Sequence, residues 1–388
     1  MKKKLLLLAA CALVLAACEG GGGTVTSDKE AALQKVVSPY VNHTVVATYS
    51  EMANAGMVLL AQCEEILDKV EKGQDYSSLM AEADASWRLM RKHWEQSEAF
   101  LYGPAGSHNI DPHIDSWPLD FNAMNALLHD ADRMAAIEEE GGAYVGDKLG
   151  YALKGFHACE YLLFESVITD GRAIGTGRPH ATNLTHAEAV YLVGIVEDLT
   201  QQAILLEYAW AGEVSATKMA LLEEAEIEPY EDHYGSQMIN AGKAGSIYVS
   251  YQEVAEEIVA GAVDIAGEVA DLKLGNPYIS STPEERDYIE SPYSCTSTID
   301  FADNIRSIEH AYCGAQAGDA SVSDYVKSQD KELDAQVRKA IEDAIKAIEA
   351  IENFESTAQN NPLVKEAIDK VRVVEEILDE EVMALLSK

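Results

Sequence analysis

Residues 155–160, with the sequence GFHACE, carry the side chains best suited to chemistry. On a helix, side chains three positions apart lie on one face, so His157 and Glu160 can point at one ion, or one can orient the other. Gly155 leaves room for a second helix or a ligand. The flanking residues are mostly large and apolar, which predicts a buried helix whose carboxylate needs a partner. The spacing alone leaves two interpretations open: a metal or ligand site, and a His–Glu pair satisfied within the core.

The spacing does not match established catalytic patterns. Zinc peptidases of the H-E-x-x-H or H-x-x-E-H type need a second His, and Tyr161 stands where the inverted motif requires it. No suitable pair of helices carries the Glu-x-x-His of a ferritin-like di-iron site, and a Ser nucleophile elbow is absent too. A metal held by His157 and Glu160 must therefore take its remaining ligands from elsewhere in the chain.

The elements that must position these residues are predicted to be helices almost throughout. Apolar residues recur at spacings of three and four, and no convincing strand alternation appears. A capping box of Thr185 and Glu188 opens one of the longest helices. We predict helices over residues 41–70, 77–101, 119–139, 147–165, 185–210, 218–240, 248–273, 296–312, 329–353 and 362–386.

Helices joined by mostly short loops predict an all-α protein of two antiparallel helical bundles, each similar to a four-helix bundle. The 388 residues are enough for two domains. We place the N-terminal bundle at residues 28–212 and the C-terminal bundle at residues 213–388. Two loops rich in aromatic, Ser, Gly and Pro residues, at 98–121 and 288–301, are candidates for function because loops often carry it.

The N-terminus predicts export and lipidation. Three lysines precede an apolar run of 13 residues, which is too short to span a membrane as a mature helix and is typical of a signal peptide. The run ends in Leu-Ala-Ala-Cys, which resembles the lipobox of bacterial lipoproteins. This implies a signal peptide over residues 1–17 and a lipid on Cys18. Residues 18–27 then form the lipidated Cys and a flexible tether.

The charge excludes one class of partner. Lys and Arg total 29 against 66 Asp and Glu, so nothing supplies the basic stripe that nucleic-acid binding requires.

Four cysteines follow residue 18: Cys63, Cys159, Cys295 and Cys313. They contain no C-x-x-C spacing, so we expect free buried thiols, with a disulfide between Cys295 and Cys313 as the alternative.

The chain resembles the imelysin family, whose hallmark G-x-H-x-x-E is present as Gly155, His157 and Glu160. Three further stretches are similar to the same family and follow its order. They are residues 87–104, a Trp-containing helix that ends in SEAFLYGP; residues 114–120, with a Trp-Pro pair; and residues 290–314, from ESPYS to YCG. The resemblance covers most of the chain beyond the signal peptide. It implies two helical bundles with the hallmark helix beside the groove between them.

The resemblance also implies a set of site residues. The metal ligands would be His157 and Glu160, with Glu98 as a third. The groove around them would be lined by Gly155, Arg88, Asp115, Trp117, Ser294, Asp300 and Asn304. Taken without the resemblance, Arg88 would pair with a carboxylate such as Asp84 or Glu95, and Trp117 would be a core aromatic.

Two functions follow from the resemblance, because the family is classed among metallopeptidases and also includes iron-regulated envelope proteins. One His and two carboxylates can hold zinc, but an oxygen-rich set suits iron at least as well. A peptidase also needs a general base and an oxyanion stabiliser, and no motif supplies either. We therefore expect a lipoprotein of the outer membrane that binds a divalent metal, iron before zinc, or a metal-linked small ligand, and passes iron to an envelope transporter. A metal-dependent peptidase is the first alternative, and a non-catalytic adhesion or scaffold lipoprotein is the second alternative.

Overall fold

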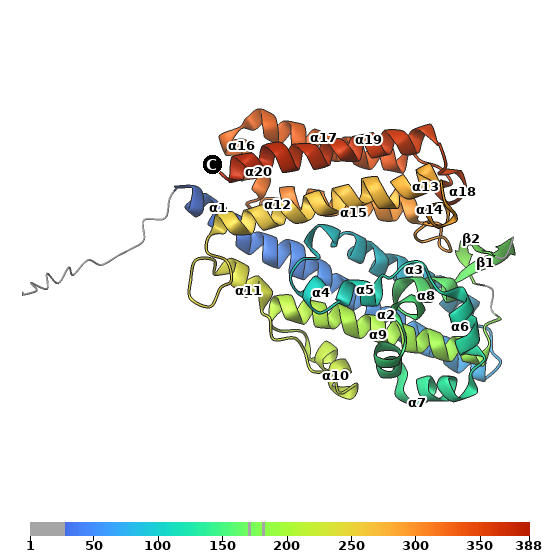
Figure 1. Ribbon diagram of the computed structural model, residues 1–388. Helices are drawn as coiled ribbons and strands as arrows, with labels where there is room; N and C mark the ends of the chain where they lie inside the picture. The colour runs from blue at the N-terminus through green and yellow to red at the C-terminus, as the bar shows by residue number, and fades with distance from the viewer. Residues whose placement is uncertain (1–27, 170–171, 181–182) are drawn as a thin grey trace, which may run out of the picture.

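The computed structural model describes residues 28–169, 172–180 and 183–388. The all-α prediction is confirmed, since 74% of the chain is helical. Figure 1 shows two layers of roughly parallel long helices, one formed by the first half of the chain and one by the second. The predicted signal peptide and Cys18 lie outside the described residues. The domain boundary at residue 212 stays a prediction.

Four long helices form the N-terminal layer, in blue to yellow-green in Figure 1: α2 (Val46–Glu71), α3 (Ser77–Glu95), α7 (Ala131–Lys148) and α9 (His186–Ala211). Helix α9 packs against both α2 and α7. It is apolar on nearly all sides, and it begins at the predicted capping box of Thr185 and Glu188. Among the described helices, α9 alone is long and apolar enough to cross a membrane, and 89% of its apolar window is buried inside the protein. Its hydrophobicity is therefore that of a core helix.

Short elements fill the stretch between α3 and α9. They are η2 (Glu98–Phe100), α4 (Pro104–Ser107), α5 (Ile110–Ile114), α6 (Phe121–Leu128), η3 (Tyr151–Leu153) and α8 (Gly155–Leu163). The helix predicted over 119–139 is two helices, because Asp130 caps a new one, α7, by accepting a hydrogen bond from the backbone nitrogen of Arg133. The helix predicted over 147–165 begins only at Gly155.

A β-hairpin follows α8, where we expected no strand. Strands β1 (Phe164–Thr169) and β2 (Arg172–Pro179) pair antiparallel, with a bulge between Phe164 and Ser166. The hairpin lies directly against the second half of the chain: a Cβ on Gly175 would come within 2.2 Å of the Tyr293 Cα, and the backbone nitrogen of Gly177 donates to the Tyr293 carbonyl. Contacts from outside the hairpin thus support strands that their own sequence pattern did not reveal.

The C-terminal layer, in yellow to red in Figure 1, is built from α12 (Tyr251–Glu268), α15 (Ser297–Cys313), α17 (Lys331–Glu349) and α19 (Pro362–Glu376), each of which packs on at least two of the others. Two π-helices continue them: η4 (Val269–Lys273) follows α12, and η5 (Ile377–Val382) follows α19. The other helices that follow α9 in the chain are short: α10 (Ala216–Glu224), α11 (Tyr234–Ile239), α13 (Gly275–Ile279), α14 (Pro283–Arg286), α16 (Val322–Gln329), α18 (Phe354–Thr357) and α20 (Met383–Leu386).

The first helix begins earlier than predicted and joins the two layers. The chain is helical from Asp28 through α1 (Asp28–Pro39) and η1 (Tyr40–Val45) into α2. Asp28 and Glu30 lie in the first turn of α1, where negative charge favours a helix. The Glu30 carboxylate also accepts hydrogen bonds from the first two backbone nitrogens of α12, those of Tyr251 and Gln252.

The cysteines are free among the described residues. The prediction of buried free thiols is confirmed for Cys63 and Cys159. It is wrong for Cys295, which is exposed, and Cys313 is half-buried.

Candidate functional site

Helix α8 brings His157 and Glu160 to the boundary between the two halves. Gly155, its first residue, has a φ of +75°, a left-handed conformation that favours glycine. A Cβ there would lie 2.3 Å from the carbonyl oxygen of Ile114, so glycine lets α8 approach the end of α5 closely. His157 is 1% exposed and Glu160 is fully buried. Nδ1 of His157 lies 3.2 Å from Oε2 of Glu160, so the two side chains form a buried pair.

The other carboxylate oxygen of Glu160 holds a loop of the C-terminal half. Oε1 accepts hydrogen bonds from the backbone nitrogens of Tyr293, at 3.0 Å, and Ser294, at 2.7 Å, and from the Ser294 hydroxyl, at 2.7 Å. Hydrogen bonds to an ionised acceptor are roughly twice as strong as neutral ones. Both oxygens of Glu160 are therefore engaged within the protein. Glu160 thus orients His157 and fixes the loop, and its predicted role as a metal ligand stays a prediction.

Nε2 of His157 faces Asp115 on the side away from Glu160. Oδ1 of Asp115 lies 3.2 Å from Nε2, but no hydrogen bond of acceptable geometry forms, so Nε2 is buried without one. The Trp117 ring packs on the His157 ring, with their centroids 4.7 Å apart. Burial lowers the pKa of His157, but the contacts with Asp115 and Glu160 raise it by more. The net result is a pKa of about 9, above the ordinary value. A buried ring nitrogen without a hydrogen bond is uncommon and calls for an explanation.

Arg91, which the sequence analysis did not single out, lies at the centre of this site. Its side chain is 1% exposed, and Nη2 lies 2.5 Å from Oε1 of Glu95 and 2.6 Å from Oε1 of Glu290. The guanidinium also pairs with Asp115 and Asp300. Because two of these carboxylates come from each half of the chain, Arg91 bridges the halves. The only signal for Arg91 in the sequence is that Glu95 follows it by four positions, and such pairs are common on helices.

Lys273 is a second buried cation and comes from the C-terminal half, at the end of η4. Its side chain is 4% exposed. Nζ lies 3.2 Å from Oε1 of Glu290 and 3.8 Å from oxygens of Glu95 and Glu98. The predicted ligand Glu98 thus faces the site from η2, with an ammonium beside it. Lys273 was not predicted, because nothing near it in the sequence indicates a buried lysine.

Buried carboxylates outnumber the bases in this site. Six acids, Glu95, Glu98, Asp115, Glu160, Glu290 and Asp300, face three bases, Arg91, Lys273 and His157. Burial raises the pKa of Glu95 and Glu98 well above the ordinary value and that of Asp300 to about 7, and neighbouring carboxylates add to each shift. At Asp115, burial raises the pKa, but Arg91, His157 and Lys273 together outweigh it and hold the pKa below the usual range. Carboxyl groups with raised pKa values hold protons more readily, so the excess of acids over bases can be balanced either by protons or by a bound cation.

Two sets of ligand atoms converge here, each with all its atoms within 4.8 Å of one another. One set is Asp115, His157 and Glu290, and the other is Glu95, Glu98 and Asp115. Metal–ligand bonds of about 2.0–2.2 Å allow ligands separated by about 4.0–4.4 Å to share one ion, so small side-chain movements would close either set. A cavity of about 260 Å³, lined by both loops singled out in the sequence, reaches Glu98, Asp115 and Glu290 of these sets. Nε2 of His157 would have to lose its proton to bind a metal; once it does, the lack of a hydrogen bond at this atom and the excess of acids over bases both fit a bound cation.

The comparisons with known proteins agree with the resemblance. The family model described as imelysin matches residues 45–378. The chain belongs to the imelysin family.

Individual relatives of the chain point the same way. Iron-regulated protein A of Synechococcus elongatus is 29% identical over 283 residues, which are 73% of this chain and 65% of that protein, so the chain spans just under two thirds of its relative. A crystal structure of an iron-regulated protein A precursor from Parabacteroides distasonis superposes with a TM-score of 0.75 at 22% identity, over 94% of this chain and 97% of that one. An imelysin-like protein from Psychrobacter arcticum gives a TM-score of 0.64 at 11% identity, over 92% and 96% of the two chains. These two structures establish the shared fold.

The other residues implied by the imelysin resemblance support the centre from its edges. Arg88 pairs with Asp84 at 2.5 Å and donates hydrogen bonds to the carbonyl oxygens of Gly177 and Ser294, so it joins the hairpin to the C-terminal loop. Asn304 donates to Oε2 of Glu95 at 2.5 Å and positions it.

Asp300 and Trp117 complete the surroundings. Asp300 accepts a hydrogen bond from the Ser291 hydroxyl while it faces Arg91. Trp117 lines both the 260 Å³ cavity and a larger one of about 680 Å³. Of the predicted groove residues, Asp115 and Trp117 contact His157 itself, and Ser294 contacts its partner Glu160. Asp300 and Asn304 contact Arg91 and Glu95 instead, and Arg88 reaches the hairpin and the C-terminal loop.

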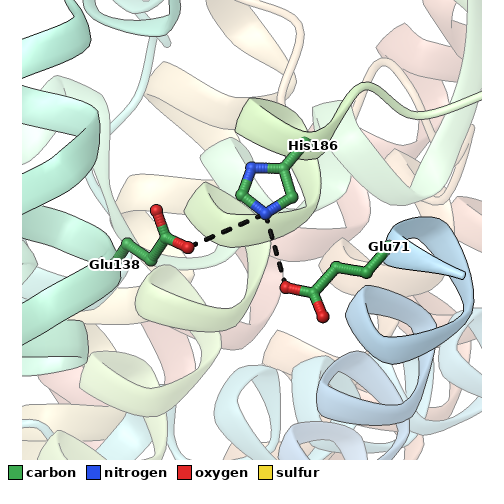
Figure 2. A group of neighbouring side chains, drawn as sticks. All are labelled: Glu71, Glu138 and His186. Carbon is green, nitrogen blue, oxygen red and sulfur yellow. Dashed lines mark hydrogen bonds and ion pairs between the residues drawn. The ribbon is translucent and has the colours of Figure 1, made fainter.

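A second His–carboxylate group lies on the outer surface of the N-terminal half. Figure 2 shows the His186 ring between Glu71 and Glu138, with Nε2 3.4 Å from one carboxylate and 3.8 Å from the other. All three side chains are about half exposed, at 49%, 49% and 55%. Water can satisfy these groups, so the arrangement resembles that of His157 in composition but lacks its burial.

Proposed function

We propose that this imelysin-family protein binds a divalent cation between its two halves, with ferrous iron preferred to zinc. One observation carries the proposal: Nε2 of His157 is buried without a hydrogen bond, and oxygens of Asp115 and Glu290 lie within 4.8 Å of it. One nitrogen and two carboxylate oxygens suit iron and also zinc. The name of the relative in Synechococcus elongatus, iron-regulated protein A, favours iron.

In this proposal Asp115, His157 and Glu290 hold the cation, and Glu160 positions the imidazole. The bond from Nδ1 of His157 to Glu160 directs Nε2 toward the ion, as outer carboxylates commonly do at metal-bound histidines. Arg91 fixes Asp115 and Glu290, one from each half. A bound cation would therefore also stabilise the contact between the two halves.

The charge of the site favours a bare or hydrated cation over an anionic iron carrier. The 260 Å³ cavity that leads to it is lined by Glu98, Asp111, Asp115, Glu268 and Glu290, with Lys273 as its single base. Burial raises the pKa of Asp111 to about 6, and neighbouring carboxylates contribute to the shift. A citrate-like or catecholate complex would bring further negative charge into this cavity, and like charges at such short range are repulsive.

The peptidase alternative has less support from the contacts. Glu160, the hallmark carboxylate, accepts three hydrogen bonds at Oε1 from the C-terminal loop and pairs with His157 through Oε2, so it is not free to accept a proton from water.

We propose further that Cys18 carries the lipid anchor, at the outer membrane, and that the protein passes iron to an envelope transporter. Mass spectrometry of the mature N-terminus, compared with that of a Cys18→Ala chain, tests the anchor.

Metal content tests the binding proposal. The chain from Glu19 onward, incubated anaerobically with Fe²⁺ or with Zn²⁺ and then desalted, should retain about one iron per chain. His157→Ala should lose it. His186→Ala is the matched control, because this exposed histidine also lies between two carboxylates, and it should retain the iron.

Three results would contradict the proposal. Iron retained equally by the His157→Ala and unchanged proteins would place the metal elsewhere. Absence of metal from every sample would favour a structural role for the His–Glu pair, as in an adhesion or scaffold protein. Zinc retained in preference to iron, together with chelator-sensitive cleavage of the insulin B chain, would favour the peptidase.

A further inference from the structure

We propose that the ammonium group of Lys273 takes the place of a second cation and limits the site to one divalent ion. The inference rests on the proposed cation site at Asp115, His157 and Glu290 and concerns the carboxylates beside it. It assigns to Lys273 the role of determining how many ions the imelysin site holds.

Lys273 lies in a cage of carboxylates that is wide for an ammonium group. Of the three acids around Nζ, only Glu290, at 3.2 Å, is within hydrogen-bond distance, whereas Glu95 and Glu98 are both at 3.8 Å. Among the described residues, Lys273 is the base that pairs with Glu98. Its burial, with 4% of the side chain exposed, would be costly without these partners. The ammonium is thus held by charge more than by close hydrogen bonding.

The same carboxylates form the second convergent ligand set. Oxygens of Glu95, Glu98 and Asp115 lie within 4.8 Å of one another, and Asp115 also belongs to the set that contains His157. A carboxylate shared between two neighbouring ligand sets is the arrangement expected of a bridged two-metal site, in which the ions lie about 3.5–4 Å apart. The ammonium occupies the side of this arrangement that faces Glu95 and Glu98.

Charge explains why one ammonium can prevent a second ion from binding. Six carboxyl groups face Arg91, Lys273 and His157, so the Lys273 ammonium is one of the few positive charges that compensate them. A second divalent ion would have to enter against the fixed ammonium. Removal of the ammonium deepens the negative excess, and a second ion would then relieve it.

Substitution of Lys273 by Met tests this inference. Mn²⁺ is the probe, followed by EPR of the free ion and by metal analysis after desalting. The unchanged chain should bind about one Mn²⁺, and the Lys273→Met chain should bind about two, with a spin-coupled EPR signal. Its melting temperature without metal should fall, and Mn²⁺ should restore it, because binding to the folded state alone stabilises it.

Lys218→Met is the matched control. Lys218 is also 4% exposed and also pairs with a buried carboxylate, since its Nζ lies 2.6 Å from Oε2 of Glu207. Its loss should lower the melting temperature as well. Mn²⁺ should not restore it beyond the effect seen in the unchanged protein, and about one Mn²⁺ should bind.

The outcomes separate this inference from the proposed function. One Mn²⁺ bound by both the unchanged chain and Lys273→Met would refute the role of Lys273 and leave the cation site intact. No Mn²⁺ in the unchanged chain and one in Lys273→Met would refute the limit to one ion, because the ammonium would then exclude the first ion and not the second. No binding in either would refute both. If the Met variant does not fold without metal, Lys273→Gln, whose amide can keep the hydrogen bond to Glu290, carries the same expectations.

Discussion

Replacement of Gly155 by alanine tests whether the close approach of α8 to α5 builds the site. Gly155 has a φ of +75°, and an added Cβ would lie 2.3 Å from the carbonyl oxygen of Ile114 and 2.6 Å from its carbonyl carbon. The left-handed conformation costs an alanine about 1–2 kcal/mol. Overpacking costs about 1–3 kcal/mol more, and here the obstructing atoms are backbone. Gly155→Ala should therefore lower the free energy of unfolding by about 2–5 kcal/mol.

The clash should also impair the site, because Asp115 directly follows Ile114. If the backbone of Ile114 moves to accommodate the methyl group, Asp115 moves relative to Arg91 and to Nε2 of His157, which now lies 3.2 Å away. We expect the variant to retain much less Fe²⁺ than the unchanged chain does. Metal analysis after desalting measures this loss.

Two other glycines separate the conformational cost from the clash. Gly73 has a φ of +61°, and a Cβ added there would have no atom within 4 Å, so Gly73→Ala should cost only the conformational part, about 1–2 kcal/mol. Gly150 has a φ of −68° and equally open surroundings, so Gly150→Ala should be neutral or stabilising by about 0.4–1 kcal/mol. Urea unfolding of the three metal-free variants gives the comparison.

The result that would refute this reasoning is specific. A Gly155→Ala variant no less stable than Gly73→Ala would show that the approach to Ile114 imposes no clash. A variant that loses stability but retains full iron binding would show that the position of Asp115 does not depend on that approach.

Three further perturbations address the carboxylates and their partners. Arg91→Ala should cost about 3–5 kcal/mol in urea unfolding, since it leaves buried carboxylates unpaired, and unchanged stability would contradict its bridging role. Glu160→Gln should cost about 1.5–3 kcal/mol, because a neutral amide replaces the ionised acceptor of three hydrogen bonds, and a midpoint equal to that of the unchanged protein would argue against this anchor. Burial raises the pKa of Asp300 from 3.8 to about 7. Between these pH values the folded state keeps a proton that the unfolded state releases. The stability of the metal-free protein should therefore fall as the pH rises from about 4 to about 7. Melting temperatures across this range should show a smaller fall for Asp300→Asn, and an identical slope would exclude Asp300 as its source.

The sequence predicted the helical architecture because its apolar spacing is regular over long stretches. The capping box at Thr185 was also readable, since both of its residues lie within one turn. The hairpin was not, because residues 164–179 lack clear alternation and depend on contacts with Tyr293, far away in the chain. Local signals therefore identified local structure, and the strands needed a distant partner.

The site was predicted in part for a similar reason. The pair of His157 and Glu160 lies on one helix and could be found by spacing. Arg91 meets partners from both halves, and Lys273 is brought inward at the end of a π-helix. Neither convergence leaves a pattern within a short stretch of sequence.

The bridge made by Arg91 has a consequence for when the proposed cation site can form. Asp115 and His157 come from the first half and Glu290 from the second, so a nascent or cleaved chain that ends after α9 would display the hallmark sequence without a complete set of ligands. The proposed ability to bind metal would appear only once synthesis has passed residue 290 and the loop has docked on Glu160. Proteolysis anywhere between the halves that lets them separate would release the ion, so the integrity of the whole chain would govern how long the ion stays bound.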